Sequence, residues 1–253
     1  MQPQAPNPKS FSPGAAAAVI LLGLVAVAVL IVGNNVFSVK TIEVEGNSLI
    51  SAGTIITLSG IQMGDSMFSI NTKKIRDAIN SNEYLEYKGI WKSYPDRIIL
   101  SVEEDTPRAQ VLFMGMQILI GKDGVVLEQR TKIELIDGIP VVKVSDIPKN
   151  TEIGKPLVAA EGQMDAVNRV LKELIAQNML HEISELNAAV LDNMYLITED
   201  AVQVTLGTIE ALPEKVTYMR ALLAEFRRNQ VAVRGGVMDV TTGKFADFRP
   251  PKQ

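Results

Sequence analysis

Eighteen consecutive uncharged residues, from Ala15 to Val32, constrain the fold of this chain more than any other feature of its sequence. All of them except Gly23 have an apolar side chain. As an α-helix the run would be about 27 Å long, close to the roughly 30 Å hydrocarbon core of a bilayer. We therefore predict a transmembrane helix over residues 15–35, preceded by a short tail over residues 1–14.

A cleaved signal peptide is the alternative interpretation of this run. Such signals have an apolar stretch of about 7 to 15 residues followed by a small-x-small cleavage site. Here the stretch is longer, and the small pair Ala26 and Ala28 lies inside it, which favours an uncleaved anchor. Lys9 is the only charged side chain before the run, so the positive-inside rule places the N-terminus in the cytoplasm and the remaining residues outside.

The charges after the run narrow the classes of function. All 29 acidic residues follow it, together with 24 of the 25 basic residues, so the exported part carries a net charge of −5. That balance argues against binding to nucleic acid or to a strongly anionic membrane surface. The chain has no cysteine, so disulfides and thiolate chemistry are excluded and packed cores must provide the stability.

The first seventy residues after the run predict a β-α-α-β-β order. Ser51 and Asn71 are good N-caps, each flanked by isoleucines at the spacing of a hydrophobic staple. Gly60 would end the first helix, and Gly64 would allow a turn before the second. The expected strands cover residues 39–44, 87–92 and 97–103. This order suits a three-stranded sheet with two helices on one face, an α+β fold.

Three signatures in this region resemble a POTRA domain. They are Val44-Glu45-Gly46-Asn47, Gly64-Asp65-Ser66-Met67-Phe68, and Tyr94-Pro95-Asp96-Arg97 leading into Val102-Glu103-Glu104-Asp105-Thr106-Pro107. Directly behind a single N-terminal anchor, this arrangement is similar to that of the bacterial cell division family FtsQ/DivIB. The resemblance implies a POTRA domain over residues 36–107.

The second half is expected to form a mixed β-sheet with helices. The pattern predicts a hairpin tip at Gly121–Gly124, helices over residues 165–180 and after Pro213, and strands over residues 138–142, 186–191, 195–198, 202–206, 237–240 and 244–248. The last two strands would form a hairpin about Thr242-Gly243. Leu206-Gly207, Lys215 and Val237-Met238-Asp239-Val240 resemble the β domain of the FtsQ/DivIB family, which implies that domain over residues 108–253.

We find no set of residues that predicts catalysis, a cofactor site or a metal site. His181 is the only histidine, and no cysteine could share a metal with it. The acidic pairs Glu103-Glu104 and Glu199-Asp200 fall at a strand end and a hairpin tip, where solvated charge is ordinary. Neither a Gly-x-Ser-x-Gly motif nor a phosphate-binding glycine loop occurs. We therefore expect a protein that is not an enzyme and has no small-molecule substrate.

A free sheet edge is the natural binding device for such a chain, because a partner segment can add to it as a further strand. The last predicted strand contains Phe245 and Phe248, which period-two alternation sends to opposite faces, so at least one should pack in the core. The family resemblance implies that the β domain binds the coiled-coil proteins FtsB/DivIC and FtsL near its C-terminal strands. The implied contact residues are Thr241, Thr242, Lys244, Phe245, Ala246, Asp247 and Phe248.

The family resemblance implies a non-enzymatic scaffold of the division septum, which agrees with the lack of a catalytic motif in the sequence. It would be a single-pass protein of the cytoplasmic membrane whose two domains face outward. The alternative is a POTRA-containing receptor or assembly factor for protein export. Proteins of that kind usually carry repeated POTRA units or a long membrane barrel, and the sequence after Pro107 suggests neither.

Overall fold

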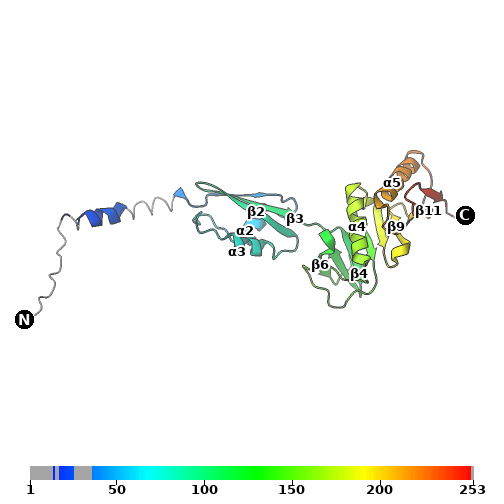
Figure 1. The fold of residues 1–253 in the computed structure, drawn as a ribbon, viewed down its shortest axis with the longest axis horizontal. Helices are drawn as coiled ribbons and strands as arrows, with labels where there is room; N and C mark the ends of the chain where they lie inside the picture. Colours follow the sequence, from blue (N-terminus) through cyan, green and yellow to red (C-terminus); the bar gives the residue numbers. More distant parts are fainter. Residues whose placement is uncertain (1–13, 15–16, 26–35, 252–253) are drawn as a thin grey trace, which may run out of the picture. The chain divides into compact units, whose positions relative to one another are not determined.

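The computed structural model describes residue 14, residues 17–25 and residues 36–251 (Figure 1). The chain divides into two compact units, Met1–Glu104 and Asp105–Gln253. Residues 17–25 are helical, whereas residues 15–16 and 26–35 of the predicted span lie outside the described residues. Within the described part of the chain, no helix is both long and apolar enough to cross a membrane. The transmembrane helix therefore stays a prediction.

The first unit has the predicted β-α-α-β-β order. Its elements are β1 (Thr41–Glu45), α2 (Ala52–Ser59), α3 (Thr72–Ile79), β2 (Leu85–Ser93) and β3 (Arg97–Glu104). The strand order in the sheet is β1-β3-β2, in which β1 is parallel to β3 and β2 is antiparallel to it. The apolar sides of the sheet and both helices enclose one core, which includes Ile55, Met67, Ile79, Ile98 and Leu100.

Both predicted helix starts in this unit are confirmed. The Ser51 hydroxyl accepts a hydrogen bond from Thr54 N at 3.2 Å, and Asn71 Oδ1 accepts one from Lys74 N at 3.1 Å. Gly60 ends α2 in the left-handed region, with φ 71°, a conformation that glycine adopts without the Cβ penalty. The predicted caps thus define where the two helices begin and where α2 ends.

The segment just before β1 is bonded to the loop between α2 and α3. Met67 N donates to Phe37 O, and Val39 N donates to Asp65 O, both at 2.8 Å. Val39 is buried in the core. The first strand was predicted to begin at Val39 but begins at Thr41, because Val39 pairs with this loop instead of with β3. The chain is consequently attached to the first unit from Phe37 onward.

A nine-stranded mixed sheet forms the second unit. Its strands are β4 (Ala109–Phe113), β5 (Met116–Ile120), β6 (Val126–Arg130), β7 (Val141–Lys143), β8 (Ile183–Asn187), β9 (Met194–Thr198), β10 (Gln203–Gly207), β11 (Val237–Asp239) and β12 (Asp247–Arg249). Their order across the sheet is β12-β11-β10-β9-β8-β7-β4-β5-β6. The pairs β4–β7, β7–β8 and β10–β11 are parallel, and the others are antiparallel.

Two helices, α4 (Gln163–Ala176) and α5 (Leu212–Arg228), supply the rest of the core in this unit. Val216, Met219 and Leu223 of α5 are buried, as the sequence predicts, and Pro213 occupies the second position of that helix. The predicted helix over residues 165–180 is too long, since α4 ends at Ala176 and residues 180–182 form a separate 3₁₀ turn, η2 (Leu180–Glu182).

Two predicted strands of the second unit need correction. The strand predicted over residues 186–191 is β8, Ile183–Asn187, because the chain turns after Asn187, whose Oδ1 accepts a hydrogen bond from Ala189 N at 3.1 Å. The strand predicted over residues 244–248 is β12, which covers only Asp247–Arg249. Residues 240–246 instead form a connection that is longer than the predicted tight turn.

Candidate partner-binding edge

The two edges of the nine-stranded sheet differ in how they are covered. Along β6, Val126 N donates to Lys155 O at 2.9 Å, and Gly154 N donates to Val126 O at 2.8 Å. Farther along the same strand, the Gln129 side-chain amide donates to Thr151 O at 3.0 Å. Residues 151–157 therefore lie along β6 and bond to the backbone of Val126 and to the side chain of Gln129, and we call this side the covered edge.

The opposite side ends at β12, which pairs with β11 alone among the described residues. Val237 lies opposite Arg249, Met238 opposite Phe248 and Asp239 opposite Asp247. No other strand or segment of the described chain pairs with β12, so we call this side the open edge. An open edge presents unpaired backbone donors and acceptors, which a partner strand can use.

The hydrogen bonds between β10 and β11 show which backbone groups face outward. Gln203 N donates to Gly236 O, and Val240 N donates to Thr205 O, so the even-numbered residues of β11 face β10. Val237 and Asp239 then bond to β12, because the backbone groups of successive strand residues point to opposite sides. Across the antiparallel pair, Phe248 is consequently the β12 residue whose backbone N–H and C=O point to the open edge.

The two phenylalanines near this edge lie in different environments. The Phe248 ring packs against Phe226 of α5, with ring centroids 4.6 Å apart, and contacts the main core of the unit. The side chain of Phe245 is 57% exposed. The expectation that at least one of them packs in the core is confirmed by Phe248. Phe245 is left as the large apolar group that a partner could cover.

The connection from β11 to β12 is held by short polar contacts. Asp239 Oδ1 accepts hydrogen bonds from Thr241 N at 2.9 Å and from the Thr241 hydroxyl at 2.8 Å. These two bonds lower the pKa of Asp239. The Thr242 hydroxyl accepts a hydrogen bond from Lys244 N at 3.3 Å, and Gly243 N donates to Val240 O at 3.0 Å. The turn is therefore a defined structure before any partner binds.

A buried lysine lies beneath this turn. The Lys215 side chain is 1% exposed, and its Nζ donates to Leu206 O and to Thr208 O, both at 2.8 Å. Its Cγ lies 3.8 Å from the position that a Cβ on Gly243 would occupy. Burial lowers the pKa of Lys215. The ammonium group joins α5 to the end of β10 at the place where the turn packs.

The residues predicted as a binding site are contiguous in the chain, but the structure gives them different roles. Phe248 points into the core, Ala246 packs against it in part, and Phe245 and Asp247 are exposed. Sequence reasoning did not assign Lys215 and Phe226 to this site. The sequence does contain a signal for Lys215, which is a lysine within the apolar stripe of α5. Lysine is rarely fully buried unless its charge has a partner.

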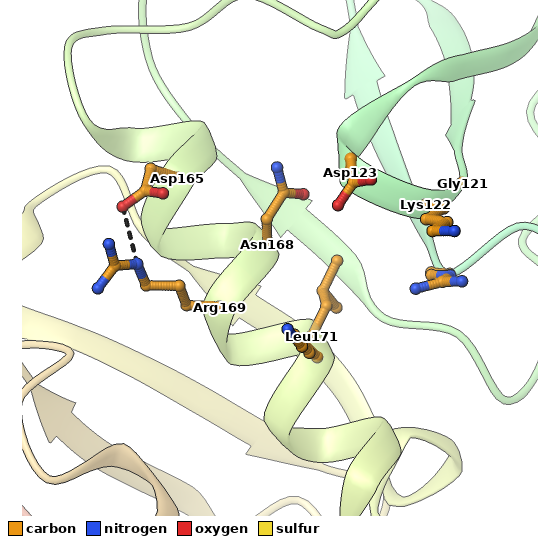
Figure 2. Close-up of a pocket in the computed structure, with 9 residues that line it drawn as sticks. Gly121, Lys122, Asp123, Asp165, Asn168, Arg169 and Leu171 are labelled. Atoms are coloured by element: carbon orange, nitrogen blue, oxygen red, sulfur yellow. Dashed lines mark ion pairs between the residues drawn. The ribbon is translucent and has the colours of Figure 1, made fainter.

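A separate pocket of about 330 Å³ lies between α4 and η1 (Lys122–Gly124). Figure 2 shows Asp165, Asn168 and Leu171 of α4 opposite Lys122 and Asp123. Asp165 pairs with Arg169 on the same helix at 3.0 Å. The side chains that line the pocket carry both positive and negative charges. No acid and base among them are directed at a common position where a substrate atom could react, so the pocket does not indicate catalysis.

Glu104 of the first acidic pair and the histidine lie in different surroundings. Glu104 accepts hydrogen bonds from Leu49 N and Ile50 N, both at 2.8 Å. Burial raises the pKa of Glu104, but these bonds and those from Ser48 outweigh it, so the pKa is lowered. His181 is exposed in η2. Among the described residues, no group of three or more acidic or histidine side chains is placed to hold a metal ion.

Comparison with known proteins shows which family this chain is similar to. Residues 37–105 match the family model described as POTRA domain, FtsQ-type. A cell division protein DivIB of Clostridium acetobutylicum is 29% identical over 148 residues, which cover 57% of this chain and 57% of that protein. Its counterpart in Clostridium tetani is 25% identical over 191 residues, covering 75% and 71%. That of Bacillus subtilis is 26% identical over 161 residues, covering 63% and 58%. The chain thus aligns with a little over half of the first and third of these relatives and with 71% of the second.

Proposed function

Because the chain belongs to the FtsQ/DivIB family of bacterial cell division proteins, we propose that it is a non-enzymatic scaffold of the division machinery. The relatives are named as cell division proteins, and the matched POTRA model is of the FtsQ type. The hydrogen bonds that Glu104 accepts from Leu49 N and Ile50 N give this carboxylate a structural role within the first unit.

The scaffold is held at the membrane by one helix over residues 15–35. The uncharged run from Ala15 to Val32 supports this anchor, and Lys9 supports a cytoplasmic N-terminus. Both units then face outward from the cytoplasmic membrane at the septum. Confinement to the membrane plane raises the local concentration of the scaffold for partners that are anchored in the same membrane.

The partners are coiled-coil proteins of the FtsB/DivIC and FtsL type, captured by strand addition along the open edge. One observation carries this proposal: the sheet has a covered edge at β6 and an open edge at β12. The backbone of Phe248 would bond to the added strand, and the exposed Phe245 side chain would pack against it. The turn residues Thr241, Thr242 and Lys244 and the exposed Asp247 complete the proposed contact.

Co-purification of the full chain with these two partners tests the proposal. Replacing Phe245 with serine removes exposed apolar surface without touching the core, so we expect binding to weaken about tenfold or more. Met114→Ser is the matched control, because Met114 is 64% exposed and its turn lies six strand spacings from β12, about 29 Å along the sheet. Equal binding by both variants and the wild type would remove Phe245 from the contact.

Depletion in cells tests the wider role. A division scaffold should leave filaments without septa when it is depleted, provided that no redundant protein replaces it. Normal septation under full depletion would instead favour the export receptor or assembly factor. The single stretch that matches the POTRA model, residues 37–105, gives that alternative little support, because export receptors usually repeat the unit.

A further inference from the structure

Three aromatic rings gather where the chain enters the first unit, and we call them the aromatic cap: Phe37, Phe68 and Tyr94. The Phe37 centroid lies 5.3 Å from that of Phe68 and 6.2 Å from that of Tyr94. Phe68 and Tyr94 lie 6.0 Å apart with their rings stacked. The side chains of Phe68 and Tyr94 are nevertheless 66% and 55% exposed. The cap is therefore an ordered cluster with much of its surface uncovered.

Two further exposed apolar residues lie on the segment and the loop that carry Phe37 and Phe68. Val36, which precedes Phe37, is 42% exposed, and Met63, in the loop that pairs with the segment before β1, is 64% exposed. Exposed apolar groups scattered singly are ordinary, but a contiguous cluster of large ones marks an interaction surface. The stacked rings of Phe68 and Tyr94, each more than half exposed, form such a cluster.

The position of the cap in the chain identifies what covers it. Only four residues separate Val32, the end of the uncharged run, from Phe37. Five extended steps span at most about 18 Å, and Phe37 is already bonded to the first unit through Met67 N. If the run crosses a bilayer, the cap must lie within that distance of the hydrocarbon boundary.

We propose that the aromatic cap rests in the headgroup layer of the same membrane, so that a lipid surface is its partner. This inference depends on the anchor in the proposed function. Aromatic side chains concentrate at the membrane–water interface, where a ring meets acyl chains and a polar tip stays wet. The Tyr94 hydroxyl provides such a tip, and Lys92, whose Nζ donates to Met67 O at 2.6 Å, holds a positive charge beside the cap for anionic headgroups.

The cap would set the orientation of the first unit. An anchor and a short connection alone leave a domain free to rotate about its tether. A second contact through Phe68 and Tyr94, which lie on loops at one end of the three-stranded sheet, fixes which end of the sheet faces the lipid. The strands β1 and β3 then lead away from the membrane surface in parallel.

Fluorescence of a single tryptophan in the full chain tests this inference. Trp91 is the only tryptophan, so Trp91→Phe provides a silent background in which Tyr94→Trp or Phe68→Trp reports on the cap. The chain is reconstituted into phosphatidylglycerol and phosphatidylcholine vesicles whose acyl chains are brominated near the headgroup. Leu49→Trp is the matched control, because Leu49 is 78% exposed and lies beyond the far end of β1, at least about 16 Å away.

We expect the cap reporters to be quenched at least twofold more than Leu49→Trp, with emission shifted to shorter wavelength. Equal quenching at both ends of the unit, or none at either end in vesicles that carry the protein through flotation, would overturn the cap contact while leaving the anchor intact. Failure of the wild-type chain to float with vesicles would overturn the anchor, and the cap contact with it. Unchanged thermal unfolding of each variant shows that the reporter did not disturb the fold.

Discussion

Phe226 of α5 and Phe248 of β12 lie ring to ring, with centroids 4.6 Å apart and planes inclined by 55°. The contact joins the second half of the last helix to the outermost strand. Gly236 is part of the same arrangement, since a Cβ there would lie 2.5 Å from the Phe248 ring. The position of the open edge therefore depends on a side-chain contact as well as on three backbone pairs.

Truncating either ring should loosen the edge strand. We expect Phe248→Ala and Phe226→Ala each to lower the free energy of unfolding by about 2 to 4 kcal/mol, through lost burial and a partial cavity. The double variant should lose less than the sum by about 0.5 to 1.5 kcal/mol, the usual worth of an aromatic pair. Denaturant unfolding of all four proteins measures this coupling, and strict additivity would show that the rings act independently.

The buried Lys215 should make stability depend on pH in the alkaline range. Because burial lowers its pKa below the ordinary 10.5, the unfolded chain binds more protons than the folded chain between the two values. The contribution of this group to folding therefore rises with pH through that window, by about 1.4 kcal/mol for each unit of lowering. Lys215→Met removes this dependence.

Denaturant unfolding of the wild type and of Lys215→Met across that window measures the effect. As the pH approaches 10.5, the free energy of unfolding of the wild type should rise relative to that of Lys215→Met. All other ionisable groups are common to both proteins, so their contributions cancel in the difference. A difference that stays constant with pH would contradict a lowered pKa for Lys215.

Gly46 and Gly60 distinguish two reasons why a turn position can require glycine. Both have positive φ, 87° and 71°, so alanine costs about 1 to 2 kcal/mol at either site. A Cβ at Gly46 would also lie 2.0 Å from Val102 O, whereas Gly60 has open space. Thermal unfolding should show a clearly larger loss for Gly46→Ala than for Gly60→Ala, and equal losses would rule out the clash.

Proline at two neighbouring positions distinguishes binding from folding at the open edge. Ala246 lies just before β12, whereas the backbone of Asp247 pairs with Asp239. We expect Ala246→Pro to remain folded and to weaken capture of the proposed coiled-coil partners, because it disturbs the approach to the edge. Asp247→Pro should instead destabilise the unit by removing a ladder bond. Undiminished co-purification with folded Ala246→Pro would contradict strand addition there.

The first unit could be predicted from sequence because its signals are local. Caps at Ser51 and Asn71, the glycine stop at Gly60 and the alternation in β3 each depend on a few neighbouring residues. The order of elements follows from them without knowledge of distant contacts. The start of β1 was missed because Val39 has a pairing partner, Asp65, that no local pattern reveals.

The last strand was predicted too long because its length is set by its neighbour. β11 has only three residues, since Gly236 precedes it and the Asp239 carboxylate turns the chain by accepting a hydrogen bond from Thr241 N. Apolar residues after β11 suggested a longer ladder, but Ala246 packs against the core instead. Coverage of β6 by residues 151–157 is equally nonlocal, so the contrast between the two edges could not be predicted.

That contrast limits the stoichiometry of any assembly built by strand addition. A sheet with both sides exposed can propagate, as each added chain offers a fresh side to the next. Here residues 151–157 bond to β6 at Val126, so among the described strands β12 is the side at which this chain can take up another strand, and further growth would depend on the outer side of that added strand. Each copy accepts one strand, and even two copies that met through β12 would form a closed pair instead of a polymer.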